Sequence, residues 1–330
     1  MKRLVPPSER GAALLAVLVL VAIMGALAAA AFERVRLSTA LAFNGAALDQ
    51  ARAYAIGVEG LLALRIDDLS AESPELTNLE GNWNGTRRTI PLPAEGRAEG
   101  TIRDGGNCFN LNSLVEGDLA SGLKRRDGGV QQFANLMVVL GLPEPKARAI
   151  GGAAADWADS DTARGTDGAE DEAYAAGDPA YRAGNTLFAD ASELRVVAGV
   201  TPEIYRTLRP YLCALPVAEL SPVNVNTLLP SQAVLLAMLD PRQAEVGRVR
   251  TLLAERPARG WASLEDFWPE AAGAGIGRAL DPMSQLQTKT AWFAMDLLIR
   301  FEGAEMEESA LVDARLRPSR VVARRWGAGE

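Results

Sequence analysis

Residues 11–32 read GAALLAVLVLVAIMGALAAAAF, a run of 22 residues without a charged side chain. A helix of that length can cross a hydrocarbon core of about 30 Å. The ten residues before the run carry three basic side chains and one acidic side chain, so we expect them to stay in the cytoplasm while the bulk of the chain crosses the membrane. The stretch predicts one membrane helix, and the rest of the fold must begin where that helix leaves the bilayer.

Three kinds of N-terminal segment fit this run, and residues 1–32 alone do not separate them. The segment can be a signal-anchor helix, or a secretory signal peptide that is removed at the alanines of residues 27–31. It can also be a prepilin-type leader. In that case a peptidase cuts after Gly11 on the cytoplasmic side, and Ala12 becomes the first residue of a mature chain that keeps the apolar helix.

The residues after the apolar run continue the helical pattern. No proline occurs between residues 33 and 69, and one broad apolar face holds Leu41, Leu48, Ala55, Leu62 and Leu69 at seven-residue intervals, with Ala47, Ala51, Tyr54, Val58 and Leu61 between them. The pattern predicts a single helical rod of about 85 Å from Ala12 to about Leu69. Because a discarded signal peptide has no need of such a rod, the pattern favours a pilin-like subunit, with a long signal anchor as the alternative.

Strand patterns occur on both sides of a long helical stretch. Two short candidates precede it, and three longer ones follow it as an antiparallel meander; they are residues 88–92, 100–103, 290–301, 309–316 and 320–326. Residues 109–280 are rich in alanine and leucine and are predicted to be helical. Since the N-terminal helix needs a sheet over its apolar stripe, the helical stretch is interpreted as an insertion into that sheet.

The predicted fold class is α+β: a pilin-like long N-terminal helix packed on an antiparallel sheet, with a large all-α insertion domain. The chain would cross the membrane once. The expected organisation is a leader (1–11), a transmembrane helix (12–32), the pilin-like helix with the first strands (33–108), the helical insertion (109–280) and the C-terminal strands that complete the sheet (281–330).

The composition excludes several kinds of site. The chain has 330 residues, with 34 basic and 42 acidic side chains and no histidine, which excludes His-based catalysis and His-ligated metals. The net charge of −8 argues against a nucleic-acid partner, because phosphate binding needs a basic face. A pattern resembling a helix-hairpin-helix at residues 196–239 holds few basic side chains at its turn, so a packing role explains it better.

Most of the negative charge comes from one segment. Residues 156–178, DWADSDTARGTDGAEDEAYAAGD, contain eight acidic residues and a single basic one. Oxygen ligands without histidine or cysteine favour calcium over a transition metal. Asp159, Asp161 and Glu170 have the spacing of positions 1, 3 and 12 of an EF-hand, but Ala163 and Arg164 at positions 5 and 6 do not support one. The segment can be a calcium-binding loop of a different kind or a solvated acidic loop, and the sequence leaves both interpretations possible.

The chain has two cysteines, Cys108 and Cys213. They are too few for a zinc knuckle, and in an exported protein two cysteines most simply form a disulfide. That bond would close a loop of about 105 residues and stabilise the fold by about 4–5 kcal/mol in the chain-entropy model. Two separately buried thiols are the alternative.

Five stretches of the chain follow one another in a distinctive order. They are RGAALLAVLVLVA around Gly11, NCFNLNSL (107–114), DWADSDTARGTDGAEDEAY (156–174), GNTLFADASELRVVAGVTPEIY (184–205) and NVNTLLP (224–230). Each is weak alone, but together they resemble the K-type minor pseudopilins of the type II (general) secretion pathway, over nearly the whole chain. Counted from Ala12, position 5 is Ala16, and K-type members share this absence of the glutamate that most pilin-like subunits carry there.

The resemblance implies a location, partners and a cofactor. A prepilin peptidase would cut between Gly11 and Ala12, the new N-terminus would be methylated, and the protein would lie in the inner membrane as a single-pass chain with its C-terminal bulk in the periplasm. The expected partners are the I-type and J-type minor pseudopilins in a ternary tip, other pseudopilins and secreted substrates, with no nucleic acid. The resemblance also implies calcium at the acidic loop, carried over to Asp159, Asp161, Asp167, Glu170 and Asp171.

The expected function is therefore that of a non-enzymatic minor pseudopilin. It would cap the tip of the pseudopilus, initiate its assembly with two other minor pseudopilins and support protein export across the outer membrane. The alternative is a membrane-anchored periplasmic metal-dependent hydrolase that uses the acidic loop. A DNA-binding pilin-like protein is a third hypothesis, against which the net charge argues.

Overall fold

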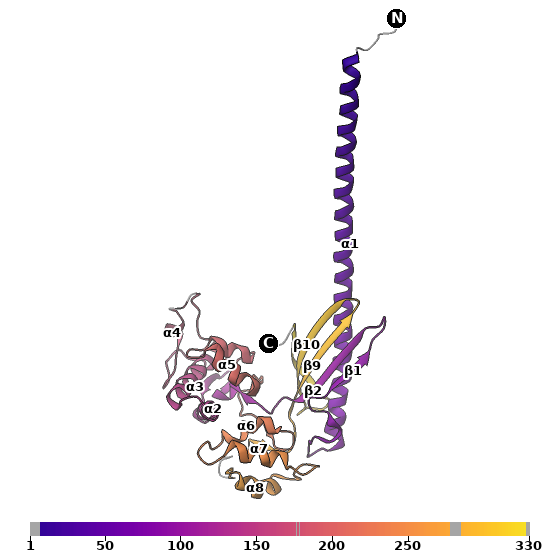
Figure 1. The fold of residues 1–330 in the computed structure, drawn as a ribbon. Coiled ribbons are helices and arrows are strands. Elements are labelled where there is room, and N and C mark those ends of the chain that lie inside the picture. Colours follow the sequence, from indigo (N-terminus) through magenta and orange to yellow (C-terminus); the bar gives the residue numbers. More distant parts are fainter. Residues whose placement is uncertain (1–6, 176, 178, 278–284, 328–330) are drawn as a thin grey trace.

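The structure is a computed structural model that describes residues 7–175, 177, 179–277 and 285–327. The first six residues of the expected leader and the expected boundary between residues 280 and 281 lie outside the described residues. One long helix projects from a globular part that consists of a sheet and a block of short helices (Figure 1).

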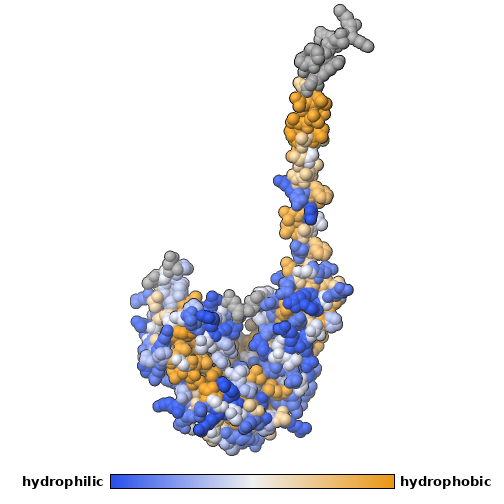
Figure 2. All heavy atoms as spheres, in the orientation of Figure 1, coloured by the Kyte–Doolittle hydropathy of each residue, from blue (hydrophilic) through white to orange (hydrophobic). Residues whose placement is uncertain are grey.

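The long helix α1 (Pro7–Glu72) is continuous over 66 residues, which corresponds to about 100 Å at 1.5 Å per residue. Its N-terminal part is long and apolar enough to cross a membrane and is not covered by other parts of the chain. In Figure 2 this part is a continuous apolar cylinder far from the globular part. The single helical rod expected from the sequence is confirmed, and Gly11 and Ala12 lie within it.

The apolar stripe of α1 differs from the expected one. The sheet buries Ala47, Ala51, Ala55, Val58, Leu62, Ile66 and Leu69, which follow each other at intervals of three and four residues. Leu41, Leu48 and Leu61 are exposed by 63%, 44% and 54%, so their predicted burial is wrong. A strict seven-residue repeat drifts by about 20° per heptad around a straight helix, and Leu41 also lies beyond the end of the sheet.

The sheet has five antiparallel strands in the order β1-β2-β9-β10-β11. The strands are β1 (Arg87–Pro91), β2 (Arg97–Asp104), β9 (Trp292–Phe301), β10 (Ala304–Asp313) and β11 (Arg320–Trp326). Alternate residues of β9 are fully buried and face α1, which is the period-2 pattern of a strand with one covered face. The C-terminal meander predicted from the sequence is confirmed, and β9 pairs with β2 across the inserted block.

The helical block, residues 109–277, lies beside the sheet. Its α-helices are α2 (Asp127–Val139), α3 (Glu144–Ala158), α4 (Asp171–Ala175), α5 (Pro202–Leu208), α6 (Val234–Ala237), α7 (Val246–Ala254) and α8 (Leu264–Gly273). Single-turn 3₁₀ helices cover Leu111–Leu114, Ala191–Val196, Arg209–Tyr211 and Pro230–Gln232, and another lies after α1 at Glu80–Asn82.

The expectation of an all-α block needs a correction, because short strands cross it. They are β3 (Phe109–Asn110), β4 (Val115–Asp118), β5 (Gly122–Arg125), β6 (Leu212–Cys213) and β7 (Val223–Asn224), and β8 (Leu286–Gln287) follows the block. They form the pairs β3–β6, β4–β5 and β7–β8. Strands of two to four residues are too short to show an alternating pattern in the sequence.

The molecule has two hydrophobic cores. One lies inside the helical block and runs from Phe109 to Leu286, and the other lies between α1 and the sheet. A polar junction connects the two parts. The buried carboxylate of Asp104 accepts hydrogen bonds from Thr290 of the sheet side and from Asn107 and Thr227 of the block side. The block is thereby fixed to the end of β2, next to the sheet.

Candidate metal centre

The acidic segment begins on the last turn of α3. Asp156 and Asp159 are three residues apart and therefore share one face of the helix, the same face as Gly152. The loop after α3 folds back over this face. A Cβ atom at Gly152 would lie 2.6 Å from the carbonyl oxygen of Asp167, so only glycine lets the loop approach the helix so closely. The sequence thus brings residues 161–170 over the two helix carboxylates.

Three of the predicted ligands come together at this point. Asp159, Asp161 and Glu170 each offer a carboxylate oxygen, and these three oxygens lie within 4.8 Å of one another. Asp159 is 4% exposed and Glu170 is 6% exposed, whereas Asp161 is open to solvent. Such a group of hard oxygen ligands, open on one side, is the type of site that calcium prefers.

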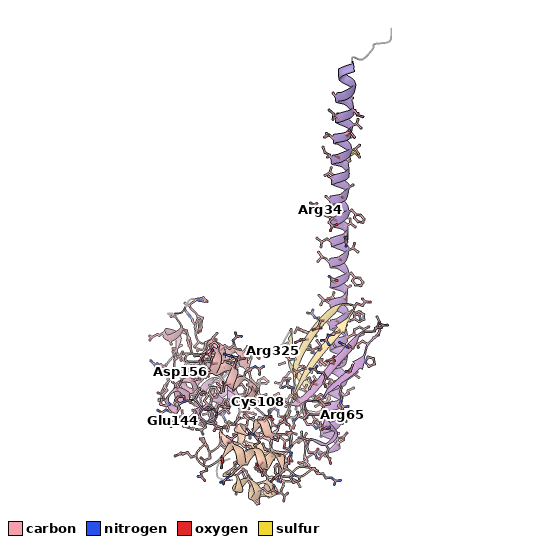
Figure 3. The ribbon with its side chains drawn as sticks, viewed as in Figure 1. Arg34, Arg65, Cys108, Glu144, Asp156 and Arg325 are labelled. Carbon is pink, nitrogen blue, oxygen red and sulfur yellow. A yellow bond between two sulfur atoms is a disulfide. The ribbon has the colours of Figure 1, made fainter. Side chains whose placement is uncertain are left out.

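Asp156 is a fourth acid of this group, and the sequence analysis did not select it as a ligand. It is fully buried, and its Oδ2 accepts a hydrogen bond of 3.0 Å from the backbone N–H of Gly165. A Cβ atom at Gly168 would collide with its carboxylate, so the loop closes tightly over it. The i, i+3 spacing of Asp156 and Asp159 at the end of α3 was the signal that could have identified it. Figure 3 labels Asp156 in the helical block.

Several carboxylate oxygens of this group have no partner. In the part of the chain that the structure describes, Oδ1 of Asp156, Oδ1 of Asp159 and both Oε atoms of Glu170 are buried and accept no hydrogen bond. Buried polar atoms without partners are rare in folded proteins, since each costs about 1–3 kcal/mol. A cation bound between Asp159, Asp161 and Glu170 would satisfy the unpartnered oxygens of Asp159 and Glu170, so the residues present fit the calcium expected from the sequence.

The electrostatics of the group point the same way. Burial, and then the charges of Asp161, Asp156 and Glu170, raise the pKa of Asp159 to about 7. Burial is also the main cause that raises the pKa values of Asp156 and Glu170. The nearest arginines do not compensate these charges fully: Arg125 donates to Asp127 and to the carbonyl of Thr166, and Arg164 donates to the carbonyl of Gly168.

The other two predicted ligands lie outside this group. The carboxylate of Asp167 is half exposed and 3.9 Å from Arg148 on the outer side of α3. Asp171 begins α4, where its Oδ1 accepts a hydrogen bond from the backbone N–H of Ala183. The geometry therefore favours Asp156, Asp159, Asp161 and Glu170 over Asp167 and Asp171 as residues that could hold a metal.

The two cysteines form a disulfide in this structure. Cys108 and Cys213 are joined over a sequence separation of 105 residues, with their Cα atoms 5.8 Å apart. The bond lies beside the parallel pair of β3 and β6 and therefore closes the first part of the helical block at its base. Figure 3 labels Cys108 at the junction of the block and the sheet.

Two buried asparagines, Asn112 and Asn226, each bind the backbone of a distant aromatic residue in the block. The sequence alone did not predict these contacts. Asn112 donates from Nδ2 to the carbonyl of Phe188 (2.9 Å) and accepts at Oδ1 from the N–H of Phe188 (2.7 Å). Asn226 makes the same two bonds, with the same lengths, to the backbone of Trp261. All four side-chain positions are buried.

The asparagine that precedes each of these residues by two positions has a similar role. Oδ1 of Asn110 accepts from the N–H of Asn112, and Oδ1 of Asn224 accepts from the N–H of Asn226. The signal in the sequence is a short repeat, NLNSL at residues 110–114 and NVNTL at residues 224–228. A repeat of five residues is too short to stand out in the sequence without the contacts that it makes.

A cleft of about 450 Å³ lies between the block and the sheet and is lined by residues such as Arg103, Arg209 and Trp326. None of the four acids that surround the candidate metal position lines this cleft. The hydrolase hypothesis expects the acidic cluster in a deep pocket, and this cleft does not supply one.

Comparison with known proteins identifies the family. Two family models described as type II secretion system protein K match residues 107–217 and 223–289. The protein K of Klebsiella pneumoniae is 36% identical over 325 residues, and that of Pectobacterium carotovorum is 33% identical over 326 residues; each alignment covers 97% of both chains. The chain belongs to the type II secretion system protein K family.

A solved structure agrees with this assignment. The crystal structure of the GspK-GspI-GspJ complex from the enterotoxigenic Escherichia coli type 2 secretion system contains a chain that is 30% identical to this one. The TM-score is 0.73, and the match covers 85% of this chain and 97% of that chain. As a protein K family member, this chain is a minor pseudopilin, and both the resemblance and the fold class expected from the sequence are confirmed.

Proposed function

We propose that this protein K family member occupies the tip of the pseudopilus and initiates its assembly with the I-type and J-type minor pseudopilins, in support of protein export across the outer membrane. The observation that carries this proposal is the similarity to a chain of the GspK-GspI-GspJ complex, in a match that covers 85% of this chain and 97% of that chain. A pseudopilin that resembles one member of a three-subunit complex over its whole fold is expected to present the same contact surfaces.

The exposed face of α1 supports the need for partners. Between the membrane segment and the sheet, α1 exposes Leu37, Leu41 and Phe43 by 60%, 63% and 58%. Apolar side chains gathered on one helix are usually covered by another protein or by lipid. Neighbouring pseudopilin helices and further pseudopilins of the filament would provide such a cover.

The position of the helical block supports a place at the tip. The block lies beside the sheet, at the end of α1 that is remote from the N-terminus (Figure 1). Together with the sheet, the block makes the globular part much wider than the single helix α1 that projects from it. A subunit of this shape fits above other subunits better than between them, so the filament would not extend past it.

We place residues 12–32 of α1 in the inner membrane and the globular part in the periplasm, with prepilin peptidase cutting between Gly11 and Ala12. Support comes from the one apolar helix that is long enough to cross a membrane and from the basic residues before it. Gly11→Val should leave the precursor uncut, as measured by the intact mass and N-terminal sequence of the membrane protein. Normal processing of Gly11→Val would contradict this assignment.

The proposed role of the acidic loop is to bind calcium, held by Asp156, Asp159, Asp161 and Glu170, and so to order the first part of the block. Calcium supplies positive charge that compensates the four carboxylates when it is bound. The chain's own residues determine where the ion can lie: α3 fixes Asp156 and Asp159, and the loop brings Asp161 and Glu170 to them. We regard this role as structural rather than catalytic, so contact with secreted substrates would involve other surfaces.

Co-purification tests the proposed function. The full chain, co-expressed with the I-type and J-type subunits and extracted in detergent, should elute with both of them as one complex. In a strain without its own copy, the chain should also restore secretion. Elution of the three proteins as separate species, together with normal secretion in the strain that lacks the chain, would contradict the proposal.

A further inference from the structure

The edge strand β11 is attached to the rest of the molecule in an unusual way. Its burial pattern is almost entirely exposed, and Val321 is its one residue among those packed against the core between α1 and the sheet. Strand β9, in contrast, places five buried apolar side chains in that core, and β10 places Ala310 and Val312 there. Apolar burial therefore contributes little to holding β11 against α1.

Polar contacts take its place along the whole strand and the turn before it. Arg317 donates to the carbonyl of Ser70, the N–H of Ser319 donates to Asp67, and the guanidinium of Arg52 lies 5.2 Å from the ring of Trp326. Between these contacts lies a charged cluster that involves the strand, α1 and β10.

The cluster consists of one arginine and two glutamates. Arg324 of β11 donates from Nε to Glu59 of α1 at 2.7 Å and to Glu308 of β10 at 3.1 Å. The Glu308 side chain is completely buried and that of Glu59 is 8% exposed, whereas Arg324 reaches in from the surface with 36% of its side chain exposed. Two buried carboxyl groups thus share a single positive charge.

No charged residue stands opposite Glu308 on either neighbouring strand. On β9, the residue opposite Glu308 is Leu297, and the residue paired with Glu308 on β11 is Trp326. Oε2 of Glu308 is buried and has no hydrogen-bond partner in the described part of the chain. If both glutamates were ionised, the cluster would keep a net negative charge inside the interface between helix and sheet, which is costly at low dielectric.

A proton removes that cost. Burial, and then the neighbouring Glu59, raise the pKa of Glu308 to about 7, whereas Arg324 helps to lower the pKa of Glu59. The two carboxyl groups lie within hydrogen-bond reach of each other. One proton between them leaves a neutral cluster with Arg324, and the proton can be donated from one glutamate to the other.

We propose that this proton, shared by Glu59 and Glu308, is what fastens the edge strand β11 to α1, so that the strand loosens as the proton is lost. When β11 opens, Arg324 withdraws and Glu308 becomes exposed, and an exposed glutamate releases its proton at its ordinary pKa. The free edge of the sheet is thereby coupled to the pH of the surrounding compartment.

The direction of the effect follows from the two protonation states. Between pH 4.5, the ordinary pKa of a glutamate, and about 7, the closed strand holds one more proton than the open strand. The equilibrium constant for opening therefore rises by up to about tenfold per pH unit in that window and levels off above it. The attachment is tightest in mildly acidic conditions.

Hydrogen exchange on the full chain in detergent tests this device. Exchange of the β11 amides that pair with β10 is measured from pH 5 to 8, with calcium in excess, and is corrected for the intrinsic pH dependence of exchange. The opening constant should rise by at least about tenfold and then level off near neutral pH. A constant that does not change with pH would overturn the proposal, and this result needs no variant.

Two variants test whether Glu308 causes the pH dependence. Glu308→Gln keeps the shape and a hydrogen-bond donor but carries no proton to lose, so its β11 amides should show an opening constant that is low and independent of pH. Glu307→Gln, on the adjacent residue of β10, should behave as the unchanged protein does. The same pH dependence in Glu308→Gln as in the unchanged protein would overturn the proposal.

Discussion

The two parts of the helical block, residues 107–217 and 223–289, begin alike and close differently. Each begins with an asparagine pair that clamps the backbone of a downstream aromatic residue, Phe188 in the first part and Trp261 in the second. Each aromatic residue stands two positions before a helix cap, Asp190 or Ser263. The two parts are thus built on one local plan, although few of their residues are the same.

The closures of the two parts differ in where the positive charge comes from. In the second part, Arg256 follows α7 and donates to the carbonyls of Val225 and Leu228, so the chain itself supplies the cation. In the first part, the acidic loop lies between α3 and Phe188, and several oxygens of its buried carboxylates have no partner among the described residues. The first part is also closed by the disulfide. The second part is thus completed from within the chain, and under the proposed calcium role the first part would be completed from outside it.

The largest expected effect concerns the disulfide. Cys213→Ser should lower the free energy of unfolding of the first part by about 4–5 kcal/mol, because the unfolded chain regains the freedom of the opened loop. Denaturant unfolding of the full chain in detergent measures this effect, with Cys108→Ser as the matched variant. If the disulfide forms, the chain should be lighter by two hydrogen atoms before reduction than after it. An equal mass before and after reduction would show that the bond does not form.

The asparagine clamps should give the next largest effect. Asn112→Ala and Asn226→Ala each leave a buried backbone N–H and carbonyl without partners, so each should cost about 3 kcal/mol of unfolding free energy. Thermal unfolding compares them, with Asn44→Ala at an exposed position of α1 as the control. If only one of the two clamps proves necessary for stability, the two parts do not share one plan.

Removal of calcium by a chelator should affect the two parts of the block differently. Removing calcium from the full chain should lower its stability by about 2.7 kcal/mol if the ion was present at a hundred times its dissociation constant. Asp159→Asn should abolish the response to chelator, whereas Asp167→Asn, matched in chemistry but outside the group, should keep it. Arg256→Met should weaken the second part and leave the calcium response intact.

The smallest expected effect is one of pH. In the chelated protein, Asp159 has a raised pKa of about 7, so the folded state holds a proton that the unfolded state releases from pH 3.8 upward. The stability of the chelated protein should therefore fall as the pH rises from about 4 to about 7. Asp159→Asn should reduce this slope, and added calcium should reduce it too, whereas Glu308, whose pKa is also raised to about 7, contributes the part that remains. A melting temperature that rises with pH in this range would contradict the assignment.

The sequence was most informative where a pattern repeats over many residues. The apolar run and the proline-free stretch after it predicted α1, and the apolar and aromatic residues of 290–301 predicted the strand β9. The buried face of α1 was predicted less well, since a seven-residue count placed Leu41 and Leu48 on the buried side, where the structure exposes them. Long regular elements depend on local physics that the sequence displays directly.

The sites were predicted less completely, because they depend on contacts between distant residues. Composition identified the acidic loop, but the separation of Asp156 from Asp167 depends on how the loop folds back over Gly152 of α3. The clamps of Asn112 and Asn226 are made with residues 76 and 35 positions away, which no local pattern shows. The charged cluster of Glu59, Glu308 and Arg324 joins three separate elements in the same way.

The most direct test of this account is hydrogen exchange of the full chain with calcium and with chelator. If the first part needs a cation from outside and the second does not, chelation should remove protection against exchange from residues 156–175 and from the part of α3 that this loop covers. Protection around Arg256 and Trp261 should stay unchanged. Equal loss of protection in both parts, or no loss in either, would contradict the account.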